Sequence, residues 1–145
     1  MSRRVRCLGW LFLLPVLAVD AEDARADATA EAVVERLFDA FNRHDIDALA
    51  ALYAADARIV SPDHEQPLHG PEGARAIYAP LFAQFPDIRD EVAGMVVQGD
   101  EVAVQFVSRG CDRDGRFCFD LPIASFLTVR DDLIIADTSY FDDSD

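Results

Sequence analysis

The sequence predicts a single α+β domain in which helices cover one face of a curved, mostly antiparallel sheet. Apolar residues recur at helical spacing between residues 29 and 53 and again between 70 and 85. From residue 88 onward the pattern changes to long strand-like segments separated by tight turns. Helices first and strands afterwards are typical of the α+β class, and 145 residues suffice for one core but not for two.

Two short helices are expected near the start of the domain. Thr29 can cap the first, which should end near Asn42, and Asp45 can cap the second. A strand is expected next, over residues 57–62, followed by a polar loop over residues 63–69. The core-facing apolar positions of the two helices are Val34, Leu37, Phe38, Phe41, Ile46, Leu49, Leu52 and Tyr53.

A third helix is expected to start at Gly70, because Pro71 suits the first helical position. Pro80 lies inside the helical pattern and should kink it, and Pro86 should end it. Four strands are then expected over residues 88–97, 101–109, 116–130 and 133–142, joined by tight turns into an antiparallel meander.

Cys111 and Cys118 flank Asp114-Gly115, a dipeptide that favours a hairpin turn. If these two residues form the loop, the cysteines face each other directly across the strands, close enough for a disulfide. This register would make them a hydrogen-bonded pair, the wider of the two antiparallel spacings. We therefore expect a disulfide, with two free thiols as the alternative.

Residues 1–26 are expected to be a signal peptide, which leaves a single domain over residues 27–145. A basic segment, SRRVR, precedes an apolar run over residues 7–19 that is too short to cross a bilayer. Small residues at alternate positions then place cleavage between Ala21 and Ala28. The expected product is exported, periplasmic or secreted, with no membrane contact after cleavage. The alternative is an uncleaved anchor.

The charge of the chain excludes several classes of function. It carries 13 basic and 27 acidic residues, a formal net charge of -14, and it contains no lysine. Such a surface repels nucleic acid, which is therefore not an expected partner. The absence of lysine excludes Schiff-base chemistry and a lysine-based phosphate loop. The simplest role of the acidity is solubility.

Residues 33–62 carry the most informative pattern, two amphipathic helices that run into a strand ending in Ser61-Pro62, with the sequence VVERLFDAFNRHDIDALAALYAADARIVSP. In order and spacing, this stretch resembles the ketosteroid-isomerase-like and SnoaL-like members of the nuclear transport factor 2-like superfamily. The resemblance extends to about residue 142. It implies a cone-shaped α+β barrel with the element order ααβαββββ, an apolar pocket for a small molecule, no cofactor, and a homodimer.

The catalytic positions of the resembled isomerases are vacant in this chain. Those enzymes use an Asp base, a Tyr and a protonated Asp in an apolar site. The matching positions hold Ser61, Leu37 and Ala124. SnoaL-like cyclases place an acid in the same penultimate strand, at the position of Ala124. The resemblance therefore implies the fold and argues against both activities in their familiar form.

Two other acids are candidates for the catalytic role. Strand alternation puts Asp120 on the face of Pro122 and Ala124, toward the pocket, unless a bulge at Pro122 moves it to the rim. Asp137 shares a strand face with Ser139, where related hydrolases of this fold also use a carboxylate; the alternative is a solvated strand face. A carboxylate buried in the pocket would have a raised pKa and could act as a general acid or base.

Metal-ligand residue types cluster in the loop before the third helix, as Asp63, His64, Glu65 and His69. Their spacing fits no closed zinc pattern, and a polar loop accounts for them without a ligand. No metal site is expected.

The expected pocket combines aromatic, aliphatic and small polar side chains, the default site for a small apolar ligand. It comprises Leu37, Tyr53, Ser61, Tyr78, Phe82, Phe106, Ala124, Ser125 and Tyr140. The first hypothesis is an exported domain that binds a small apolar molecule, as an isomerase, cyclase or hydrolase that uses Asp120 or Asp137. The alternative is a noncatalytic ligand-binding or dimeric assembly module.

Overall fold

Within the described residues, three helices and a six-stranded sheet follow the predicted order with one added strand, β2. The computed structural model describes residues 21–142, so most of the expected signal peptide lies outside the described residues. The elements are α1 (Ala21–Asn42), α2 (Ile46–Ala50), β1 (Tyr53–Val60), β2 (Leu68–His69), α3 (Gly70–Gln84), β3 (Arg89–Gln98), β4 (Glu101–Cys111), β5 (Cys118–Arg130) and β6 (Leu133–Tyr140). The predicted α+β class is confirmed, and β2 is an addition within the expected loop. Among the described helices, none is long and apolar enough to cross a membrane.

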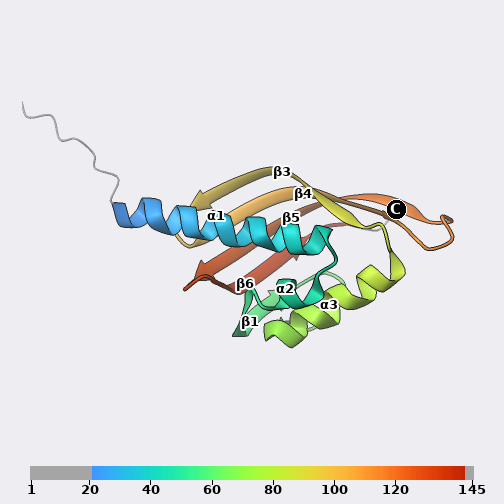
Figure 1. Ribbon diagram of the computed structural model, residues 1–145, viewed down its shortest axis with the longest axis horizontal. Helices are drawn as coiled ribbons and strands as arrows, with labels where there is room; N and C mark the ends of the chain where they lie inside the picture. Colours follow the sequence, from blue (N-terminus) through green and yellow to red (C-terminus); the bar gives the residue numbers. More distant parts are fainter. Residues whose placement is uncertain (1–20, 143–145) are drawn as a thin grey trace, which may run out of the picture.

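The sheet is open, with the strand order β2-β1-β6-β5-β4-β3. Neighbouring strands are antiparallel except β1 and β6, which run parallel. Register shifts in β3–β4 and β5–β6 interrupt the ladders, and such bulges bend a sheet. In Figure 1, α1 lies along β3, β4 and β5, while α3 lies beside β1, in agreement with the contacts between these elements. The helices and the inner face of the curved sheet therefore enclose the core.

Helix α1 starts well before Thr29, so the prediction that Thr29 caps it is wrong. The segment before Thr29 is rich in alanine and charged residues that favour helix, and Glu22 and Asp23 lie in the first turn, where acidic side chains are favourable. The helix contributes one apolar stripe to the core. Its buried members are Ala30, Val33, Val34, Leu37, Phe38, Ala40 and Phe41.

The next helices begin where the sequence predicts. Asp45 caps α2 and accepts a hydrogen bond from the Ala48 N–H over 3.0 Å. Helix α2 ends at Ala50, so Tyr53 opens β1 instead of continuing the helix. Helix α3 begins at Gly70, whose φ of +63° and close approach to the Ala55 carbonyl leave no room for a side chain.

The β4–β5 hairpin carries the Cys111–Cys118 disulfide. The Asp112 N–H donates to the Phe117 carbonyl over 2.8 Å, so residues 112 and 117 are the hydrogen-bonded pair. The cysteines are therefore a non-hydrogen-bonded pair, with Cα atoms only 4.1 Å apart. This corrects the expected wider spacing. The turn is longer than two residues, because the Gly115 N–H already donates to the Asp112 carbonyl.

Replacing both cysteines with serine is expected to lower the free energy of unfolding by about 2 kcal/mol, because the cross-link restricts the unfolded chain. Urea denaturation with and without reductant measures this difference. Reductant should destabilise the wild-type protein and leave the Cys111→Ser/Cys118→Ser variant unchanged. Equal stability of oxidised and reduced wild-type protein would contradict the prediction.

Candidate functional site

A pocket of about 540 Å³ lies between the inner face of the sheet and helices α1 and α3. Its wall is mainly aromatic and aliphatic, and exposed residues such as Phe117 and Asp63 mark its mouth. The apolar lining includes Leu37, Phe38, Phe41, Leu49, Ile59, Ile77, Leu81, Phe85, Ile88, Val104, Phe106, Phe119, Leu121, Ile123, Leu127 and Phe141. These dimensions and this chemistry suit a small, mostly apolar ligand.

Asp137, in β6, is the most deeply buried carboxylate of the pocket, with an exposed fraction of 3%. Its Oδ2 accepts a hydrogen bond of 2.7 Å from the Tyr53 hydroxyl. Its Oδ1 is buried and has no hydrogen-bond partner among the described residues. Burial raises the pKa of Asp137 to about 6, and the hydrogen bond from Tyr53 partly offsets the rise. One oxygen is thus held by Tyr53, while the other is buried without a hydrogen-bond partner among the described residues.

Two tyrosines surround this carboxylate. The Tyr53 and Tyr78 hydroxyl oxygens lie 3.4 Å apart, and Tyr78 itself lines the pocket. Burial raises the pKa of both phenols well above its ordinary value, and the charge of Asp137 adds to both shifts. Both tyrosines therefore remain protonated at neutral pH and can donate hydrogen bonds.

Asp90, at the start of β3, is a second pocket carboxylate. It lies directly opposite the buried Ser108 of β4 in the strand register. The Asn42 side chain fixes its backbone by two hydrogen bonds, of 2.9 Å to the carbonyl and 2.8 Å from the N–H. Burial raises the pKa of Asp90 to about 7, and Ser108 partly offsets the rise. The Asp90 Oδ1 is buried without a hydrogen-bond partner among the described residues.

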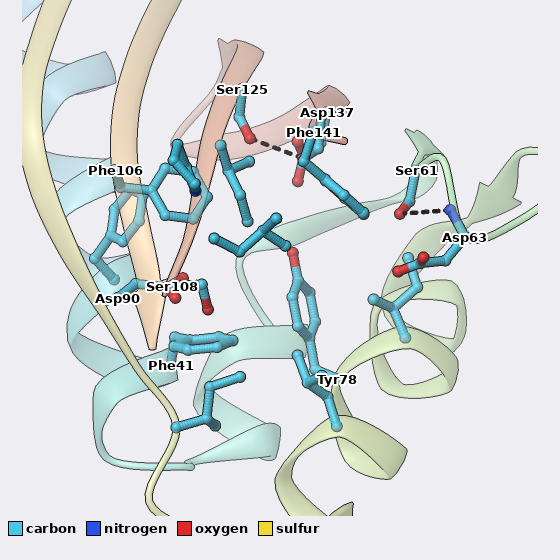
Figure 2. Close-up of a pocket in the computed structure, with 18 of the residues that line it drawn as sticks. Phe41, Ser61, Asp63, Tyr78, Asp90, Phe106, Ser108, Ser125, Asp137 and Phe141 are labelled. Carbon is cyan, nitrogen blue, oxygen red and sulfur yellow. Dashed lines mark hydrogen bonds between the residues drawn. The ribbon is translucent and has the colours of Figure 1, made fainter. Parts of the chain in front are cut away.

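Figure 2 shows how these groups are arranged around the pocket. Asp90 and Ser108 lie at one side, Asp137 lies with Ser125 at the top, and the Tyr78 hydroxyl points between them. Ser125 shares a hydrogen bond of 2.7 Å with Ser139 on the neighbouring strand. The pocket therefore has two separate acidic positions within an apolar wall.

The described lining residues include no arginine, histidine or lysine. The titratable lining residues are Asp63, Tyr78, Asp90, Asp120, Asp137 and Asp142. No group of three His, Cys, Asp or Glu side chains in the described part of the chain could hold a metal ion. The pocket chemistry is therefore that of carboxylates, hydroxyl groups and aromatic rings.

The side chains of β5 that face the pocket are not all those predicted. Ser125 is buried and lines the pocket, whereas its neighbour Phe126 is 54% exposed on the outer face. Ala124 shares that outer face by alternation and does not line the pocket. The β4–β5 register continues unbroken past Pro122, so no bulge occurs there. The proline is tolerated because β6 pairs with β5 only from Ala124 onward, which leaves the Pro122 nitrogen at a free edge.

Asp120 lies at the rim of the pocket, the alternative weighed from the sequence. Its side chain is 68% exposed and forms an ion pair of 3.1 Å with Arg109, which also pairs with Glu91. Strand alternation directs it away from the interior, since the apolar lining residues Phe119, Leu121, Ile123 and Leu127 of β5 are all odd-numbered. Asp120 is thus a weaker catalytic candidate than Asp137.

The remaining predicted residues divide into three groups. Leu37, Ser61, Tyr78, Phe106 and Ser125 line the pocket, and Tyr53 lies immediately behind Asp137. Phe82 packs on the rings of Phe41 and His44 instead of lining the pocket. Tyr140 is 59% exposed on the outer face, so its predicted place in the pocket is wrong.

Asp90 and Ser108 are site residues that the sequence reasoning missed. A signal was present, because Asp90 follows the apolar Ile88 by two positions and alternation puts both on one face. The sequence does not show that Ser108 would lie opposite, since that depends on the β3–β4 register.

Comparison with known proteins identifies the family of this chain. The family model of the SnoaL-like domain matches residues 34–136. Among proteins of curated function, none matches the chain.

Several solved structures are similar to the chain. A putative SnoaL-like polyketide cyclase from Jannaschia sp. CCS1 is 25% identical, with a TM-score of 0.71 over 81% of this chain and 88% of that one. A protein with a ketosteroid isomerase-like fold from Catenulispora acidiphila, in complex with trimethylamine, is 24% identical, with a TM-score of 0.71 over 77% and 86%. A putative polyketide cyclase from Xanthomonas campestris is 24% identical, with a TM-score of 0.68 over 81% and 93%.

Proposed function

The chain belongs to the family of SnoaL-like domains, and on that premise we propose that it binds a small, mostly apolar molecule and transfers a proton through Asp137. One observation carries the proposal: Asp137 is buried in the pocket wall with Oδ2 held by Tyr53 and Oδ1 without a partner. A carboxylate so placed is a general base when ionised and a general acid when protonated.

The geometry supports a division of roles between the two oxygens of Asp137. The Tyr53 hydroxyl orients the carboxylate through Oδ2, so Oδ1 is the atom that takes a proton from carbon or from water. A pKa of about 6 leaves Asp137 largely ionised at neutral pH yet more basic than an ordinary aspartate. This chemistry serves an isomerase, a cyclase or a hydrolase. It also compensates for Ser61, which stands where the resembled isomerases have their base.

A pH–rate profile on a panel of small ketones and epoxides tests the proposal. We expect turnover with an acid limb near pH 6, which reports ionisation of Asp137 in the free enzyme. Asp120→Asn, at the rim, should leave this limb in place. Ligand binding to the pocket without turnover of any panel member would favour a noncatalytic binding domain.

Replacing Tyr53 with phenylalanine is expected to move the acid limb to higher pH. The Tyr53 hydrogen bond stabilises the ionised carboxylate and lowers its pKa, so its loss raises the pKa above about 6. Activity should therefore fall more at pH 6 than at pH 9. An unchanged acid limb with a uniform loss of activity would show that Tyr53 only supports the fold.

The similar proteins support small-molecule binding at the level of the fold. The Catenulispora acidiphila protein is in complex with trimethylamine, and TerC, a further structure similar to this chain with 18% identity and a TM-score of 0.69, was co-crystallised with polyporic acid. These two different ligands support the proposal that the pocket of this chain takes a small molecule.

The outer face of the sheet supports a second role, in assembly as a homodimer. Phe126 and Tyr140 are exposed on this face with ring centroids 6.0 Å apart, and Val96 is 70% exposed on β3. Exposed apolar side chains on one face are typical of association surfaces. The second copy is the proposed occupant, because a face shared by identical chains is self-complementary about a two-fold axis.

Light scattering after size-exclusion chromatography checks the dimer. The wild-type chain should elute as a dimer and the Phe126→Glu/Tyr140→Glu variant as a monomer with an unchanged circular dichroism spectrum. Phe117→Glu, an exposed phenylalanine at the pocket mouth, is the matched control and should remain dimeric. A wild-type monomer at high concentration would contradict this assembly.

We also propose export to an oxidising compartment. The basic and apolar segments over residues 2–19 and the Cys111–Cys118 disulfide support it. Intact mass of protein recovered from the periplasm or medium should show a new N-terminus between residues 21 and 28 and two hydrogens fewer than the reduced chain. Recovery of uncleaved chain only from the cytoplasm would overturn the proposal.

A further inference from the structure

The pocket contains one buried carboxylate, Asp137, and one half-buried carboxylate, Asp90, and its described lining has no basic side chain to compensate them. Asp137 and Asp90 lie in different parts of the wall, and each has a buried oxygen without a hydrogen-bond partner among the described residues. The lining arginine that such a pair would usually require is missing from the described wall. A carboxylate with a buried oxygen that has neither a cation nor a donor is costly in its ionised form. A positively charged ligand would supply the missing partner.

The other titratable groups around the carboxylates do not offer that charge. Tyr53 from β1 and Tyr78 from α3 face Asp137, and both are neutral. Ser108 faces Asp90. The mouth adds Asp63, Asp120 and Asp142, and the nearby Arg109 is paired with Glu91 and Asp120. The described surroundings are therefore acidic or neutral throughout.

Aromatic rings supply the second element of a cation site. In Figure 2, Phe106 and Phe41 lie on either side of Asp90 and Ser108, and Tyr78 lies across the pocket from them, below Asp137. The Phe41 and Phe106 side chains are buried, with exposed fractions of 4% and 8%, so water does not screen their π faces. Aromatic faces attract alkylated ammonium groups, and most strongly where the site is desolvated.

Apart from the two carboxylates, the pocket offers few hydrogen-bond acceptors. This favours cations that have few N–H donors. A primary ammonium has three N–H donors to satisfy, whereas most of the wall around the two carboxylates is aromatic or aliphatic. A tertiary ammonium has one N–H and a quaternary ammonium has none. The apolar wall therefore suits a nitrogen that carries alkyl groups.

We propose that this pocket binds a small tertiary or quaternary ammonium compound, with its charge held by the two negative charges of Asp137 and Asp90 in the wall and its alkyl groups against the aromatic rings. The proposal rests on the pocket of the proposed function but not on catalysis by Asp137. It narrows the ligand from small apolar molecules in general to organic cations.

Binding of a cation should be linked to proton release. The cation favours the ionised carboxylates, so affinity is highest above the pKa of both groups and falls as the pH drops through about 7 and about 6. At pH 5 only about a tenth of Asp137 is ionised, which predicts at least about tenfold weaker binding than at pH 8.

Titration calorimetry with choline and its neutral isostere 3,3-dimethylbutan-1-ol tests the inference. The two probes have the same shape, and neither titrates between pH 5 and pH 8. We expect choline to bind at pH 8 at least about tenfold more tightly than the isostere. Choline affinity should fall at pH 5, while isostere affinity should stay unchanged.

Variants test whether the preference for choline and its pH dependence arise in the pocket. Asp137→Asn should remove the preference for choline, and Asp90→Asn should weaken choline binding and reduce its pH dependence. Asp56→Asn is the matched control, because Asp56 is an exposed acid of β1 outside the pocket, and it should bind as the wild type does. Thermal unfolding of each variant confirms that the fold is kept.

Equal affinity for choline and the isostere, or choline affinity independent of pH, would overturn the inference. If neutral ketones or epoxides are turned over and choline does not compete, the inference fails while the proposed function stands. If neither probe binds and no panel member is turned over, the inference and the proposed function both fail.

Discussion

Asp137→Asn is expected to lower kcat/KM by about 10³-fold on any substrate that the wild-type protein turns over. Asparagine has the shape of aspartate, and its carbonyl oxygen can still accept the Tyr53 hydrogen bond. Its amide cannot take a proton, so the variant keeps the pocket and loses the base. The measurement is steady-state kinetics at pH 8, where the wild-type carboxylate is ionised.

The loss should appear mainly in kcat, since a neutral substrate needs the base in the transition state and not for binding. Asp56→Asn provides the same charge change on the exposed surface and should retain wild-type activity. Adding Tyr53→Phe to Asp137→Asn should cost little more, because Tyr53 acts through the missing carboxylate. Near-normal kcat in Asp137→Asn would assign the proton transfer to another group.

Local signals in the sequence predicted most of the fold. Asp45 lies at the cap of α2 because its carboxylate satisfies a free N–H within three residues. Cys111 and Cys118 pair because a glycine turn folds their two strands together. These features depend on neighbours a few residues away, so a single sequence shows them.

The phase of β5 could not be predicted in the same way. Phe119, Leu121 and Ile123 face inward, while Phe126 faces outward with Ala124. Both faces of the strand carry apolar residues, so the alternation of hydrophobicity does not choose between them. A change of phase by one residue exchanges the two faces, and that exchange removed Ala124 and Asp120 from the pocket interior.

The burial of Asp90 depends on contacts that are distant in the sequence. Asn42 fixes the Asp90 backbone across a separation of 48 residues, and Ser108 lies opposite only through the β3–β4 register. No local pattern encodes either contact. The alternation of inward and outward side chains in its own strand predicts Asp137 as a candidate. Its hydrogen-bond partner Tyr53 is 84 residues away, and the sequence predicts Tyr53 only as a lining residue of the pocket.

The two pocket carboxylates are expected to make the unliganded protein less stable as the pH rises from 4 to 8. Their pKa values in the folded protein, about 7 for Asp90 and about 6 for Asp137, lie above the ordinary 3.8. The folded state therefore binds more protons than the unfolded state in this window, and stability falls as those protons are lost. Well below pH 3.8 the carboxylates are protonated in both states and the pH dependence vanishes.

The Asp90→Asn/Asp137→Asn variant should remove this dependence, because asparagine resembles the protonated acid at every pH. We expect the variant to exceed the wild type by about 4 kcal/mol at pH 8, less than the full pKa shifts allow because the pocket opens to solvent. Urea denaturation at pH 4, 6 and 8 measures the difference. Glu35→Gln/Asp56→Asn removes two exposed acids outside this pocket and controls for the general repulsion within a chain of net charge -14. If the free energy of unfolding of the wild type depends on pH as weakly as that of the pocket variant, water or a counter-ion compensates these carboxylates. That result would also count against a cationic ligand.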